Sequence, residues 1–75
     1  MKYLDVVKWK NPQNWAEKED IMVVQGTTGA YVEVYHVLEF EYGNRSTEKM
    51  EDLRVVGRCT AYEPAEDIYK RYVRA

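Results

Sequence analysis

Residues 30–42 read AYVEVYHVLEFEY and carry the clearest structural pattern of the chain. Their side chains would alternate between two faces, and β-branched and aromatic residues are frequent among them. A period of two residues with this composition predicts one long, half-buried β-strand. Its core side would carry Ala30, Val32, Val34, His36, Leu38, Phe40 and Tyr42. Its outward side would carry Tyr31, Glu33, Tyr35, Val37, Glu39 and Glu41.

Three other stretches also have the apolar pattern of strands. They run from Lys2 to Lys10, from Asp20 to Gln25 and from Leu53 to Glu63. Between the second of these and the long strand, residues 26–29 read GTTG, which is a turn signal. Pairing Gln25 with Ala30 would place Val23 opposite Val32 on one apolar face. We therefore predict a β-hairpin at this turn.

Two helices are predicted beside the strands. A short one would run from Pro12 to about Lys18, with Asn11 as its N-cap. It is too short to be stable alone, so we expect Trp15 to anchor it on the sheet.

The second helix would run from Pro64 to about Arg74, with acidic residues first and basic residues last, as the helix dipole favours. Its i, i+4 charge pairs would be Glu66–Lys70 and Asp67–Arg71. Its apolar stripe should cover the sheet and comprises Ala65, Ile68, Tyr69, Tyr72 and Val73.

The predicted order is therefore β-α-β-β-β-α. It indicates an α+β fold, with a small, mostly antiparallel sheet and the C-terminal helix packed on one face. With 75 residues, we expect residues 1–75 to form a single domain with one small core. A partly closed barrel is the alternative, because Gly57 would suit a bend in a long strand.

Composition narrows the function classes. Eleven Lys and Arg residues against thirteen Asp and Glu residues give a net charge of −2, which disfavours a generic duplex binder. A single cysteine excludes an internal disulfide and a cysteine zinc cage, so we expect no metal and no cofactor. Because no apolar stretch suits a signal peptide or a membrane span, we expect a cytoplasmic protein without a membrane partner.

The only histidine and the only cysteine would become neighbours if Tyr42 pairs with Leu53. That register places His36 beside Cys59, the minimal form of an activated thiol nucleophile. Both would lie on the core side under the last helix, and the sequence supplies no orienting acid or oxyanion loop. We therefore favour an inert core pair and expect no enzyme and no catalytic residue. A thiol-dependent hydrolase or a redox thiol is the alternative.

Carboxylates on the outward face would meet arginines in the same register. Glu39 would lie between Arg54 and Arg58, and Glu33 and Glu41 would lie along the same strand. Arginines keep neighbouring carboxylates ionised, so a salt-bridged surface is favoured over a catalytic carboxylate pair.

This outward face also carries tyrosines among its charges. Its candidate partner-binding residues are Tyr31, Tyr35, Arg54, Arg58 and Tyr62. Tyrosine and arginine are enriched where proteins bind each other. The sequence therefore favours a small non-enzymatic binding protein, either a stoichiometric interaction module or an inhibitor. Its small size and the lack of a catalytic motif fit an accessory protein of a phage or another mobile element.

Three alternatives stay open at this point. The same tyrosines and arginines could stack the bases of a single-stranded nucleic acid or a nucleotide, although the glutamates would repel phosphates. The binding surface could instead surround Trp9 and Trp15. An unpaired strand edge would also permit a homodimer.

Overall fold

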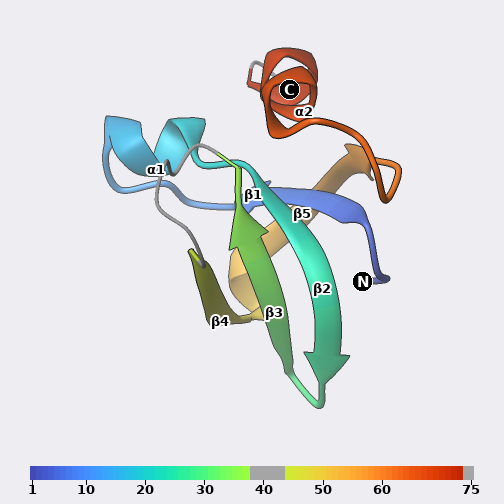
Figure 1. The fold of residues 1–75 in the computed structure, drawn as a ribbon. Helices are drawn as coiled ribbons and strands as arrows, with labels where there is room; N and C mark the ends of the chain where they lie inside the picture. Colours follow the sequence, from blue (N-terminus) through green and yellow to red (C-terminus); the bar gives the residue numbers. More distant parts are fainter. Residues whose placement is uncertain (38–43, 74–75) are drawn as a thin grey trace.

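The computed structural model describes residues 1–37 and 44–73. In these ranges, five strands form one antiparallel sheet in the spatial order β4-β3-β2-β1-β5. The strands are β1 (Asp5–Trp9), β2 (Met22–Thr28), β3 (Tyr31–His36), β4 (Arg45–Lys49) and β5 (Leu53–Arg58). Helix α1 (Trp15–Glu19) follows β1, the 3-10 helix η1 (Met50–Asp52) joins β4 to β5, and α2 (Ala65–Tyr72) lies beside the sheet (Figure 1).

This architecture confirms the predicted α+β class with a C-terminal helix. The sheet has one more strand than predicted, because β4 lies in the polar segment between the long strand and β5. Strands β4 and β5 are its two edges. The described strands therefore form an open sheet. No helix in the described ranges is long and apolar enough to cross a membrane.

The sheet buries apolar side chains on both faces. In β1, the consecutive residues Val6 and Val7 are both fully buried, and neighbouring side chains of a strand point to opposite faces. Val7 belongs to a cluster with residues of β2, β3 and β5, against which Met1, Trp9 and Met50 pack. Val6 belongs to a second cluster on the face beneath α2. The alternating pattern of the sequence predicts one buried face and one solvated face, so burial on both faces differs from that prediction.

Helix α2 covers the second cluster through its predicted stripe. Ile68 is buried in the cluster, and Ala65, Tyr69, Tyr72 and Val73 pack against it. The predicted pair of Lys70 with Glu66 is present, with 3.0 Å between Nζ and Oε1. Arg71 does not pair with Asp67; its Nη2 lies 2.6 Å from Oε2 of Glu63, which precedes the helix. Thus α2 is tied to its own N-terminal loop as well as to the sheet.

The β2–β3 hairpin has a different register from the predicted one. Thr28 pairs with Tyr31 and Val24 pairs with Val34, so Gly29 and Ala30 form the turn. Gly29 has a φ of +60°, which glycine adopts without strain. The pairing of Gln25 with Ala30 is wrong because β2 continues through two threonines, which suit strands, and an irregularity between Val24 and Gly26 shifts the ladder.

The predicted pairing of the long strand with β5 is also wrong. Strand β3 pairs with β4, whereas β5 crosses the sheet and pairs with β1, for example Val7 with Val55. His36 and Cys59 are therefore not cross-strand neighbours. Leu38, Glu39, Phe40, Glu41 and Tyr42 lie outside the described residues, as do the pairings predicted for them.

Helix α1 begins later than predicted, and its anchor is not Trp15. Asn14 is the N-cap in place of Asn11, and its Oδ1 accepts a hydrogen bond from the Glu17 N–H at 2.9 Å. Trp15 then opens the helix, and 73% of it is exposed. Trp9 is the tryptophan that packs against the core. The expectation that Trp15 packs on the sheet is therefore wrong.

Candidate binding site

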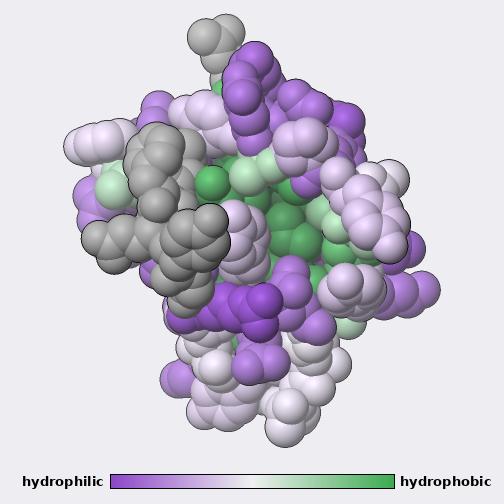
Figure 2. Space-filling model, viewed as in Figure 1, coloured by the Kyte–Doolittle hydropathy of each residue, from purple (hydrophilic) through white to green (hydrophobic). Residues whose placement is uncertain are grey.

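A hydrophobic hollow opens below α2, framed by more polar residues (Figure 2). We call this concavity, between α2 and the sheet, the α2 cleft. Its volume is about 190 Å³. The buried side chains of Val23 and Ile68 contribute to its lining, and so do two tyrosines, of which Tyr3 is 55% exposed and Tyr35 half-buried. The rest of the lining comprises Leu4, Gln25, Cys59, Thr60, Ala61, Glu63 and Ala65.

Leu4 gives the cleft an unusual backbone geometry. Its φ of +73° lies in the left-handed region, which a branched side chain such as leucine rarely occupies. Two hydrogen bonds hold it there: the Leu4 N–H donates to the Val24 carbonyl, and the Cys59 N–H donates to the Leu4 carbonyl, each at 3.0 Å. Such strain costs on the order of 1–3 kcal/mol and gathers at functional sites. It therefore marks the cleft as a candidate site.

Cys59 lines the cleft as a protonated thiol. Its Sγ lies 3.5 Å from the Leu4 carbonyl oxygen, to which the S–H donates. Burial is the main cause that raises the pKa of the Cys59 thiol, and the negative charge of Glu63 raises it further. A thiol held in its neutral form is a poor nucleophile. Cys59 therefore serves the packing of the cleft wall in this arrangement.

Glu63, in the loop before α2, contributes to the lining of the cleft. One carboxylate oxygen, Oε1, accepts from the Thr60 N–H at 3.2 Å, and the other is paired with Arg71. Both carboxylate oxygens are thus engaged within the loop and helix. This arrangement fixes the loop that carries Ala61 relative to α2.

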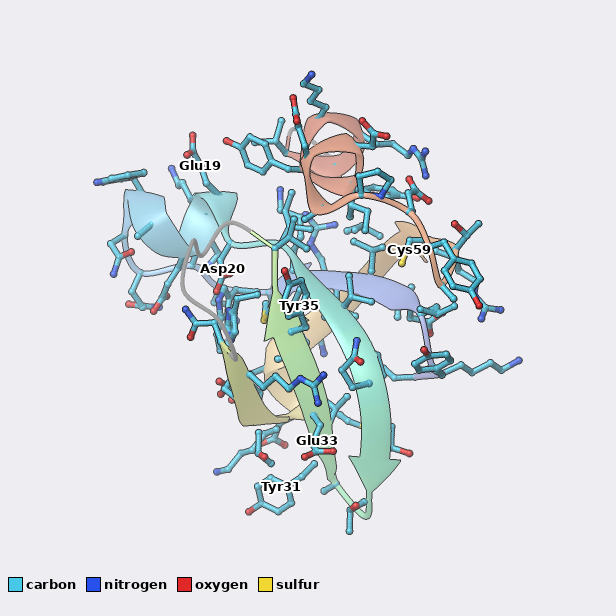
Figure 3. The ribbon with its side chains drawn as sticks, in the orientation of Figure 1. Glu19, Asp20, Tyr31, Glu33, Tyr35 and Cys59 are labelled. Atoms are coloured by element: carbon cyan, nitrogen blue, oxygen red, sulfur yellow. The ribbon has the colours of Figure 1, made fainter. Side chains whose placement is uncertain are left out.

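Three of the predicted partner-binding residues lie at or near the α2 cleft. Tyr35 lines it, and Figure 3 shows Tyr35 and Cys59 on two sides of the space below α2. Tyr62 is 97% exposed and directly follows Ala61 of the lining. Arg58 donates from Nη2 to the Tyr3 carbonyl at 2.9 Å.

The other two predicted residues lie elsewhere. Tyr31, at the hairpin end of β3, borders a separate concavity with Lys49 and Met50 (Figure 3). Arg54 borders a third concavity with Lys8. They are separated because β3 and β5 are not neighbours in the sheet. The five residues therefore do not line one common concavity.

A polar network surrounds His36, and no local pattern in the sequence predicts it. The His36 Nδ1 lies 3.0 Å from Oδ1 of Asp20, and its Nε2 lies 2.7 Å from Oγ of Ser46. The Ser46 hydroxyl donates to Oε2 of Glu48 at 2.8 Å, and the Trp9 indole N–H donates to Oδ2 of Asp20 at 2.9 Å. These residues are far apart in the sequence, and only the β3–β4 pairing brings Ser46 to His36.

The order Asp20–His36–Ser46 has the outline of a catalytic triad. A triad, however, needs the serine hydroxyl to give its proton to the histidine. Here the Ser46 proton is directed to Glu48, so Ser46 accepts from the ring of His36. The imidazole therefore lies between the Asp20 carboxylate and the Ser46 hydroxyl. In this geometry the network joins β1, the C-cap of α1, β3 and β4 and does not activate a nucleophile.

No group of three or more residues in the described ranges could hold a metal ion. Comparisons of the chain with protein-family models, curated proteins and solved structures returned no match.

Proposed function

We propose that this chain is a small non-enzymatic binding protein whose α2 cleft holds an apolar side chain of a protein partner. The observation that carries this proposal is the cleft itself, which combines a buried floor with partly exposed tyrosines. Its 190 Å³ is smaller than the roughly 300–1,000 Å³ of small-molecule pockets. Binding hot spots commonly consist of an anchor side chain in a well-packed pocket.

The chemistry around the cleft supports a protein partner. Tyr3 and Tyr35 offer large, amphipathic rings that lose little conformational entropy on binding. Gln25 and Thr60 add polar groups to the lining. The exposed Tyr62 lies next to it and would extend the contact area beyond the anchor. We therefore expect a partner surface that presents one large apolar residue among polar ones.

The cleft walls are also held in place before any partner arrives. Leu4 is fixed by backbone hydrogen bonds on both sides, and Glu63 ties the neighbouring loop to α2. Preformed sites avoid part of the ordering cost of association. A stoichiometric inhibitor, such as one from a phage or mobile element, is one form of this proposal. We place the partner in the cytoplasm, because a single cysteine forms no internal disulfide and suits a reducing compartment.

The test begins with a peptide ligand selected by the intact chain from a random displayed library. Isothermal calorimetry then compares the chain with the Ala65→Leu variant, which adds bulk to the cleft from within α2. The matched control is Ala16→Leu, the same change at an exposed position of α1. We expect Ala65→Leu to weaken peptide binding by about tenfold or more, because a filled pocket excludes the anchor.

Thermal unfolding of both variants accompanies the calorimetry. Filling a cavity commonly preserves or raises stability, so Ala65→Leu should stay folded while it loses affinity. Equal affinity of the chain and both variants would remove the α2 cleft as the binding surface. Failure to select any peptide that contains a large apolar residue would argue against the proposal as a whole.

Binding of a single-stranded nucleic acid or a nucleotide stays an alternative prediction. Its platform of tyrosines and arginines is divided in the structure, because Tyr31, Tyr35 and Arg54 border three separate concavities. Quenching of intrinsic fluorescence by an oligonucleotide at low salt would favour this alternative, and its absence would remove it.

A further inference from the structure

We propose that His36 is a pH-sensitive tie, which holds the edge strand β4 on the sheet while its ring carries two protons and loosens β4 when one of them is lost. His36 is the only histidine of the chain, and its side chain is 11% exposed. It ends β3, the strand that pairs with β4. Asp20, Ser46 and Glu48, which belong to its polar network, do not line the α2 cleft, so this inference is independent of the proposed function.

The hydrogen bonds of the network use two protons of the His36 ring. An ionised carboxylate only accepts hydrogen bonds, and Nδ1 lies 3.0 and 3.1 Å from the two carboxylate oxygens of Asp20. Nδ1 must therefore carry a proton. The Ser46 hydroxyl has one proton, which it gives to Oε2 of Glu48 at 2.8 Å. Nε2, at 2.7 Å from the Ser46 Oγ, must then carry the second proton, and a ring with both protons is a cation.

The charges around the ring favour this cation. Two carboxylates from different elements are joined to the ring by the network: Asp20 is the C-cap of α1 and bonds the ring directly, and Glu48 of β4 bonds it through a serine. The basic residues of β4, Arg45 and Lys49, alternate to the other face of the strand, where they are exposed. Opposite charges close to a histidine stabilise its protonated form.

A neutral His36 ring cannot keep the same set of hydrogen bonds. Asp20 is held in place by the Trp9 indole N–H, so Nδ1 keeps its proton and Nε2 becomes an acceptor. The Ser46 proton must then turn to Nε2, and Glu48 loses its donor. A charge-assisted bond between β3 and β4 becomes a neutral one of about half the strength. The contribution to stability is therefore present while the ring is protonated and is lost as the pH rises through the range of the imidazole.

Strand β4 is suited to respond to this loss, because apolar packing does little to hold it. It is described in full, and it contributes no residue to either hydrophobic cluster. It is also an outer strand of the described sheet, with β3 as its neighbour. Segments with few buried apolar contacts open most easily. Opening of β4 would leave the backbone groups of β3 without their partner strand, as at any free sheet edge.

The experiment follows the ring of His36 by NMR in the intact chain, from about pH 5 to about pH 9, where carboxylates are ordinarily ionised. The ring signals need no assignment among histidines, because the chain has one. We expect both ring nitrogens to stay protonated above the ordinary imidazole pKa of about 6.5. Hydrogen exchange is measured over the same range and divided by the intrinsic rate at each pH. Protection of the β3–β4 ladder should fall by about tenfold as the ring loses its proton, whereas that of the β1–β5 ladder should stay constant.

A matched pair of variants tests the part played by Glu48. Glu48→Gln keeps an acceptor for Ser46 but removes the charge, so it should lower the midpoint of the ring titration by about half a pH unit or more. Glu51→Gln removes the same charge from an exposed position of η1 and should change the midpoint little. Equal shifts in the two variants would overturn the role of the network. A midpoint at or below about 6.5 in the unchanged chain would overturn the charged state. Constant protection of β4 while the ring titrates would overturn the tie.

Discussion

At the scale of single residues, Gly57 decides how closely α2 approaches the sheet. A β-carbon at this position would overlap the ring and hydroxyl of Tyr72. That hydroxyl donates to the Arg58 carbonyl at 2.9 Å, so Tyr72 links α2 to β5 by a hydrogen bond. From the sequence, Gly57 would suit a bend in the alternative of a partly closed barrel, whereas the structure explains this glycine by the close approach of the Tyr72 side chain.

We expect Gly57→Ala to lower the free energy of unfolding by about 1–3 kcal/mol, because the added methyl group displaces Tyr72 and its hydrogen bond. Urea unfolding measures this change. The matched control is Gly26→Ala, where the nearest contact of an added β-carbon is the Glu33 carboxylate at 3.8 Å. If Gly57→Ala is as stable as Gly26→Ala, Tyr72 does not hold the helix in the way described.

The raised pKa of the Cys59 thiol leads to a prediction about its reactivity and about how the stability of the chain depends on pH. Because burial and Glu63 raise the pKa of its thiol, the folded chain keeps the proton to higher pH than the unfolded chain. The thiol therefore contributes stability below its ordinary pKa, and this contribution is lost as the pH rises through the folded pKa. We expect iodoacetamide to modify Cys59 slowly in the folded chain at neutral pH and faster in denaturant. Equal rates in both conditions would contradict a protected thiol.

At the scale of elements, apolar alternation located β3, and the stripe of α2 located the helix and its buried face. Strand β4 was not predicted, because its residues RSTEK are polar and it lies at the sheet edge. The strand pairings were predicted wrongly because the registers contain irregularities. Irregularities at Val24/Gly26 and at Val6/Val7 shift the registers, and such shifts leave little trace in a two-residue pattern. Because β4 was not predicted, β5 was paired with the long strand instead of with β1.

The polar network around His36 should hold β4 on the sheet. We expect His36→Ala to cost about 1–3 kcal/mol, since it leaves Asp20 and Ser46 without their shared partner. Hydrogen exchange should become faster in the β3–β4 ladder and change little in β1 and β5. The control is Thr47→Ala, at an exposed position of β4. Uniform acceleration in all strands would show that the network does not act on β4 in particular.

At the scale of the whole molecule, burial on both faces of the sheet explains where the α2 cleft lies. On one face, Met1, Trp9 and Met50 pack against the first hydrophobic cluster. The other face is only partly covered by α2, and the uncovered part forms the α2 cleft. The cleft combines the N-terminal segment, β2, β3 and the loop before α2. Of its residues, Tyr35 was predicted from the sequence as partner-binding, whereas Cys59, Ala65 and Ile68 were predicted only as core-side residues. That these residues meet in one cleft depends on contacts between distant segments, which no local pattern reports.

The most direct measurement of the central claim is an NMR structure of the chain with its selected peptide. We expect intermolecular nuclear Overhauser effects between the methyl groups of Ile68, Ala65 and Val23 and one apolar side chain of the peptide. Such contacts would place the anchor inside the α2 cleft. Contacts that involve only Tyr31 and Met50, at the other end of β3, would contradict the claim.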